Sequence, residues 1–116
     1  MRDHRKLEAF GLADVLALRV YHITKTFPDD ERYGLTSQLR RAAVSIGANI
    51  VEGSARSSEA DYVRFLTISY SSACELEYEL SLADRLGYIP KQIAPEISLL
   101  ASRTCRALRG LVSAFS

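Results

Sequence analysis

Glutamates at positions 75, 77 and 79 are the first candidates for chemistry, because carboxylates on the helices of a bundle can bind metal ions. A carboxylate di-iron centre needs two Glu-x-x-His pairs on facing helices. The sequence contains two histidines, and neither follows a glutamate at that spacing. The ligand set is therefore incomplete. We expect no metal or other cofactor, and we expect Glu75, Glu77 and Glu79 to be solvated or paired with arginines.

Nucleophilic and phosphate-transfer chemistry is equally poorly supported by the sequence. Serines are numerous, but no GxSxG motif occurs and no histidine is placed to act as a general base. The GSARS stretch has a single glycine and no lysine, so it is not a phosphate-binding loop. Cys74 and Cys105 lack CxxC spacing and are interpreted as small buried residues without a disulfide or zinc site. We therefore predict that the protein is not an enzyme.

Arginine is the remaining residue type that could bind a ligand. The net charge is only +1, so any nucleic-acid surface must come from local patches. Arg103, Arg106 and Arg109 step by three near the chain's end, and guanidinium groups suit bidentate phosphate contacts. The alternative is a solvated helix face that carries these charges near a helix C-terminus. The candidate phosphate contacts are Arg40, Arg41, Arg56, Arg64, Arg103, Arg106 and Arg109.

Residues 35–57 form the stretch around which the rest of the chain is organised. Thr36 or Ser37 is predicted to cap this helix, and Gly53 to end it in the left-handed conformation. Gly47 and Asn49 are poor helix formers beside the apolar stripe, which suggests close packing and a satisfied polar contact inside the bundle or at an interface. The stripe has helical spacing and consists of Leu35, Leu39, Ala42, Ala43, Ile46 and Ile50.

Three further helices are predicted. The first covers residues 13–27 and ends before Pro28. The next covers residues 58–86, with Ser57 or Ser58 as its cap and Gly87 as its stop. The last covers residues 91–115. Pro95 makes the first turn of the last helix irregular or marks its true start. Residues 1–11 are a polar lead-in. The chain is predicted to be a single all-α domain over residues 1–116, an antiparallel up-down-up-down four-helix bundle.

The third predicted helix carries two partly apolar lines of residues instead of one. A helix with two such lines contacts more neighbours than one bundle provides, so the pattern predicts self-association. The inner line is Leu66, Ser69, Ala73, Leu76, Leu80, Ala83 and Gly87, and the second line is Ile68, Ser72, Glu75, Leu82 and Leu86.

The stretches SQLRRAAVSIGANIVEGSAR and DYVRFLTISYSSACELEYELSLADRLGYI closely resemble the bacterial four helix bundle protein family, also called 23S rRNA intervening-sequence proteins. Gly47 stands where proline is frequent in that family, and Ser71 where glycine is usual. The resemblance implies a four-helix protomer that assembles into a homopentamer. It also assigns a structural or interface role, built around the N-x-x-E-G-x-x-R block, to Gln38, Asn49, Glu52, Gly53, Arg56 and Glu75.

The family's functionally described relative is the accessory variability determinant of diversity-generating retroelements, a nucleic-acid-binding partner of a reverse transcriptase. We therefore expect a non-catalytic, cytoplasmic homo-oligomer associated with RNA or DNA and of mobile-element origin, with a reverse transcriptase or another protein as a further partner. The alternative is a protein–protein adaptor without nucleic-acid affinity. Arginines clustered on one exposed ring favour the first hypothesis, and arginines dispersed among glutamates favour the second. No membrane association is expected.

Overall fold

Four α-helices make up most of residues 2–116, the part of the chain that the computed structural model describes. Two short 3₁₀ helices, η1 (His4–Lys6) and η2 (Asp29–Glu31), precede α1 and α2, and no strand occurs in the described residues. The four helices are α1 (Glu8–Thr24), α2 (Leu35–Ser54), α3 (Glu59–Arg85) and α4 (Ala94–Ser113).

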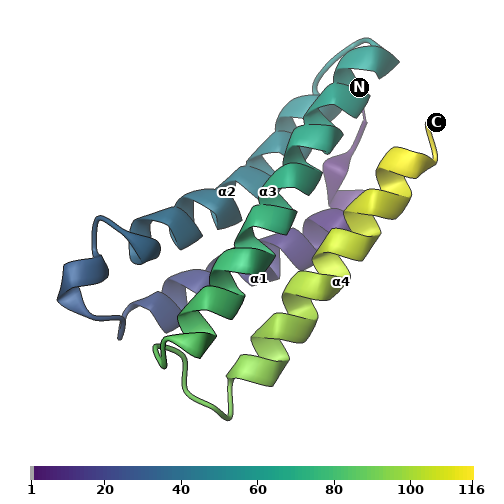
Figure 1. The fold of residues 1–116 in the computed structure, drawn as a ribbon. Helices are drawn as coiled ribbons and strands as arrows, with labels where there is room; N and C mark the ends of the chain where they lie inside the picture. The colour runs from purple at the N-terminus through teal and green to yellow at the C-terminus, as the bar shows by residue number, and fades with distance from the viewer. Residues whose placement is uncertain (1) are drawn as a thin grey trace.

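The helices form an antiparallel bundle in which each helix runs against the next (Figure 1). Helices that follow one another in the chain pack side by side, and α1 also packs against α4, which closes the ring. Both chain ends lie at the end of the bundle where α2 connects to α3. The predicted up-down-up-down four-helix bundle is therefore confirmed.

The core is formed by one stripe from each helix, as the helical spacing predicts. On α3 the predicted inner line is buried at every position from Leu66 to Ala83, whereas its last predicted member, Gly87, lies beyond the helix end and is exposed. On α2 the predicted stripe from Leu35 to Ile50 is buried as well. Burial of the leucine and isoleucine side chains in these stripes, each contributing about 1.5–3 kcal/mol relative to exposure, stabilises the bundle more than helix propensity does.

The first helix differs from its predicted limits at both ends. It begins at Glu8 instead of residue 13, because Ala9 already belongs to the buried stripe. It ends at Thr24, three residues before Phe27, and the Phe27 ring packs beside Tyr88 with ring centroids 5.4 Å apart. Phe27 therefore contributes to the core from the connection ahead of Pro28, not from the helix.

The ends of α2 are formed by residues other than those predicted. Neither Thr36 nor Ser37 caps the helix; instead the Glu31 Oε1 atom accepts a hydrogen bond from the Leu35 N–H, at 3.1 Å. Gly53 is helical rather than left-handed, and the helix ends at Ser54. Glycine is required here for a steric reason, since a Cβ atom at position 53 would lie 2.8 Å from the Phe65 Cβ atom. Gly53 thus allows α2 and α3 to approach closely.

The predicted limits of α3 and α4 agree better with the structure. Ser58 caps α3 by accepting a hydrogen bond from the Asp61 N–H, at 3.1 Å. Gly87 follows the helix with a φ of 82°, in the left-handed region that favours glycine. Pro95 lies in the first turn of α4, where its missing N–H costs no helical hydrogen bond.

Candidate functional site

A polar cleft of about 590 Å³ lies between α2 and α3 on the outside of the bundle. Its walls combine both charges and several hydroxyl and amide groups. Gln38 and Glu75, to which the sequence resemblance gave a structural or interface role, both lie here. The lining residues are Gln38, Arg41, Ala42 and Ser45 from α2, and Ser72, Glu75 and Glu79 from α3.

Glu79 is the unusual member of this cleft. The residue is only 6% exposed, and its Oε1 atom has no hydrogen-bond partner among the described residues. Burial, assisted by the neighbouring Glu75 carboxylate, raises the pKa of Glu79 to about 7. The expectation that Glu79 is solvated or paired with an arginine is therefore wrong. Helical spacing alone could have placed Glu79 beside this cleft, because position 79 continues the line that runs through Ser72 and Glu75.

A chain of hydrogen bonds joins the two helices below the cleft. The Asn49 amide Nδ2 donates to the Ser45 carbonyl oxygen at 2.8 Å and to the Ser45 hydroxyl at 2.9 Å. The Ser45 and Ser72 hydroxyls are 2.8 Å apart. The polar contact expected for Asn49 thus exists, and within the chain it lies along α2. The close packing expected at Gly47 does not occur within residues 2–116, where a Cβ atom at this position would meet only a Phe10 ring carbon at 3.8 Å.

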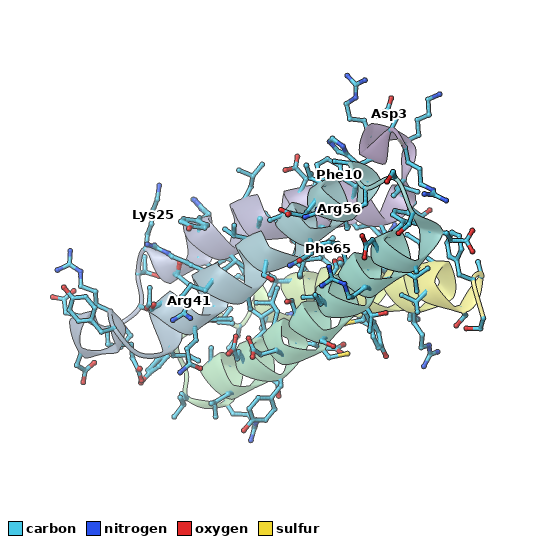
Figure 2. The ribbon with its side chains drawn as sticks, turned by 90° about the horizontal axis from the view of Figure 1, so that it is seen from above. Asp3, Phe10, Lys25, Arg41, Arg56 and Phe65 are labelled. Carbon is cyan, nitrogen blue, oxygen red and sulfur yellow. The ribbon has the colours of Figure 1, made fainter. Side chains whose placement is uncertain are left out.

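Beyond the cleft, two arginines flank the Phe65 ring. The Arg56 guanidinium lies 4.9 Å and the Arg64 guanidinium 4.5 Å from the ring centroid. Figure 2 shows Arg56 and Phe65 close together, with Arg41 farther along toward Lys25. Two members of the N-x-x-E-G-x-x-R block form a carboxylate–guanidinium pair, since Arg56 Nη2 donates to Glu52 Oε1 at 2.7 Å. The pair is exposed, so it contributes little to stability.

The remaining candidate arginines do not form one patch. Arg40 lies against α1, where its Nε donates to the Thr24 hydroxyl at 2.9 Å and its guanidinium stacks on Tyr21. The side chains of Arg103, Arg106 and Arg109 are exposed on α4 and form no salt bridge within the described residues. Each step of three residues advances an α-helix by about 300°, so these three arginines fan out over roughly 120°.

Arg106 and Arg109 border a smaller hollow between α3 and α4, which also contains both cysteines. Cys105 is buried, as predicted, but Cys74 is exposed, which corrects the prediction that both are buried. The Cys105 thiol donates to Glu77 Oε1 at 3.6 Å, and burial, Glu77 and Cys74 raise its pKa to about 12. The sequence alone did not reveal this pairing, because helical spacing does not give the register between two antiparallel helices.

Two features are absent from residues 2–116. No group of three or more histidine, cysteine, aspartate or glutamate side chains is arranged to hold a metal ion. Within the same residues, no helix combines the length and the hydrophobicity needed to span a bilayer.

Comparison with known proteins agrees with this architecture. The sequence model for 23S rRNA-intervening sequence proteins matches residues 5–110. The chain belongs to this family. Its fold also matches the crystal structure of a protein of unknown function from the S23 ribosomal protein family of Bacteroides thetaiotaomicron VPI-5482, with a TM-score of 0.82 and 27% identity over 90% of this chain and 97% of the other. No curated protein matches the chain.

Proposed function

We propose that this 23S rRNA-intervening sequence protein is a non-catalytic homo-oligomer that acts in the cytoplasm and binds RNA or DNA through α4. The observation that carries the proposal is the set of exposed arginines, Arg103, Arg106 and Arg109, which have no carboxylate partner among the described residues. By contrast, Arg56 and Arg64 are paired with Glu52 and Asp61. Guanidinium groups free of carboxylates are available for phosphate.

Self-association increases the affinity for phosphate that these arginines provide. One copy has a net charge of +1 and contributes only a short, fanned group of arginines, so its attraction for phosphate is weak. A closed oligomer repeats the group around its axis, and several weak contacts then act together. The family resemblance supplies the number five. Light scattering after gel filtration should therefore give about five times the chain mass of 12.9 kDa.

The proposed binding is weakly sequence-selective, because it uses phosphate contacts instead of base contacts. The test is a titration of labelled RNA and duplex DNA at two salt concentrations. On duplex DNA, log K should fall with log salt by about 0.9 for each phosphate neutralised. The triple variant Arg103→Ala, Arg106→Ala, Arg109→Ala should lose most of this affinity and flatten the salt dependence.

The matched control removes the same charge elsewhere. Lys25, Arg32 and Arg85 are exposed on other parts of the bundle, so changing all three to alanine should leave binding nearly unchanged. No binding by the parent protein at low salt would overturn the proposal. Binding that survives the α4 variant would also contradict it, and would move the phosphate contacts to Arg41, Arg56 or Arg64.

A protein–protein adaptor is the second candidate function. The observation in its favour is the dispersal of basic residues among acidic ones along α2, α3 and their connection, where Arg56 pairs with Glu52 and Arg64 with Asp61. A surface of alternating charges suits a protein partner better than a polyanion. An oligomer that binds neither RNA nor DNA in the titration would support this function over the first.

A further inference from the structure

The line of residues through Ser72, Glu75 and Glu79 on α3 is bordered by exposed apolar side chains. Ile68 is 39% exposed and Leu86 is 51% exposed. Their positions continue the same helical spacing, which places them on the same side of α3 as the cleft. This side of the bundle therefore combines a buried, unpartnered carboxylate oxygen with apolar surface on both sides of it.

The cleft contains carboxylate oxygens that lack hydrogen-bond donors. An ionised carboxylate only accepts, and the Glu79 Oε1 atom accepts nothing within the described residues. Glu75 adds a second carboxylate on the rim, and the Ser45 and Ser72 hydroxyls line the wall below. Arg41 lines the same cleft but forms no salt bridge with either carboxylate. A guanidinium, with five donors in a planar fork, matches this set of acceptors.

We infer that a second copy of the chain docks on this cleft and places an arginine guanidinium between Glu75 and Glu79. The inference rests on the proposed self-association and identifies its surface. Charge complementarity supports a second copy, because each copy carries exposed arginines that have no carboxylate partner in the described residues. A protein partner also covers Ile68 and Leu86, which a small cationic ligand in the cleft leaves in water.

Docking of a guanidinium makes assembly depend on pH. The charged groups that face Glu79 are Glu75 on its own helix and Arg41 from α2. In the free protein the pKa of Glu79 is about 7. A guanidinium lowers that pKa, so docking releases a proton whenever the free carboxyl is protonated. Assembly is therefore strongest above about pH 7 and weakens by at most tenfold per pH unit per site below it.

The experiment compares sedimentation equilibrium of the full chain and two variants between about pH 6 and pH 8. Glu79→Gln should raise the dissociation constant between copies at least about tenfold and abolish its pH dependence. Glu75→Gln changes an exposed residue, so it should leave the fold intact and weaken assembly in the same direction. The control is Glu77→Gln, which removes the same charge from the α4 side of α3 and should assemble like the parent protein.

The outcomes separate the inference from the proposed function. A monomeric parent protein overturns both. An oligomer that neither Glu79→Gln nor Glu75→Gln weakens overturns the inference alone. Excess L-arginine should dissociate the parent oligomer more than sodium chloride of equal ionic strength does. If L-arginine instead raises the melting temperature without changing the mass, the cleft holds a small guanidinium ligand and the docking of a second copy is refuted.

Discussion

The two neighbours of α3 are held in different ways. Against α2, the contact uses small and hydroxyl residues: Gly53 lies under Phe65, and the buried Ser69 hydroxyl donates to the Ile46 carbonyl oxygen at 2.7 Å. The backbones of α2 and α3 consequently stay close over more of their length than those of α3 and α4. Against α4, the polar contact between the two helices in the described residues is a long hydrogen bond from the Cys105 thiol to the Glu77 carboxylate. One helix thus combines a close-contact side with a looser side that is partly open to water.

The largest expected effect is a difference in reactivity between the two cysteines, which tests how open the α3–α4 side is. Thiolate is the reactive form of cysteine, and Cys105 is buried with a pKa near 12, whereas Cys74 is exposed. Iodoacetamide at about pH 8 should therefore modify Cys74 at least about 100-fold faster than Cys105. Mass spectrometry of a time course measures both rates, with Cys74→Ser to isolate Cys105. Equal rates in the folded protein would show that the two helices separate readily.

The close approach of α2 and α3 is tested at Gly53. Gly53→Ala places a Cβ atom 2.8 Å from Phe65 Cβ, which is not the movable end of a side chain, so the helices must shift. We expect a loss of about 1–3 kcal/mol in the free energy of unfolding, measured in urea. The control is Gly110→Ala on α4, which meets no atom within 4 Å and should gain about 0.5–1 kcal/mol through helix propensity. Stabilisation by both changes would contradict a close contact at Gly53.

The smallest effect concerns the hydroxyl that joins α3 to α2. Ser69→Ala removes the bond to the Ile46 carbonyl and should cost about 1 kcal/mol in the free energy of unfolding. Thr67→Ala is the comparison, because the Thr67 hydroxyl is exposed and bonds only to the Val63 carbonyl of its own helix. We expect Thr67→Ala to be neutral or slightly stabilising. If thermal unfolding shows equal losses of stability for the two variants, the Ser69 hydrogen bond does not stabilise the contact between α2 and α3.

Helical periodicity predicted the fold because burial of one stripe per helix decides which bundle forms. It predicted the lines on α3 correctly, from Leu66 to Ala83 inside and from Ile68 to Leu86 outside. It did not predict the cap of α2, because that cap comes from Glu31, which precedes the helix and follows no capping pattern. It also misplaced Cys74, whose exposure depends on how far apart α3 and α4 lie.

The candidate site was predicted only in part, for a related reason. Gln38 and Glu75 came from the family resemblance, and they share one cleft. Glu79 was grouped with its neighbours Glu75 and Glu77 as solvated or paired, although the three carboxylates have different surroundings. Residues two apart on a helix point about 200° away from each other, so Glu77 faces α4 while Glu75 and Glu79 face α2. Sequence adjacency concealed a difference that helix geometry creates.

The carboxylate of Glu31 has one further consequence, for how the bundle opens. One oxygen accepts the Leu35 N–H at the start of α2, and the other accepts the Tyr88 hydroxyl from the turn between α3 and α4, at 2.9 Å. These two bonds lower the pKa of Glu31, because they stabilise its charged form. Together with the Phe27–Tyr88 ring contact, Glu31 therefore joins the two helical hairpins, α1–α2 and α3–α4, at this end. Detachment of the second hairpin removes the Tyr88 hydroxyl from Glu31 and weakens the hold of this carboxylate on the start of α2. We therefore expect local opening at this end to involve both hairpins.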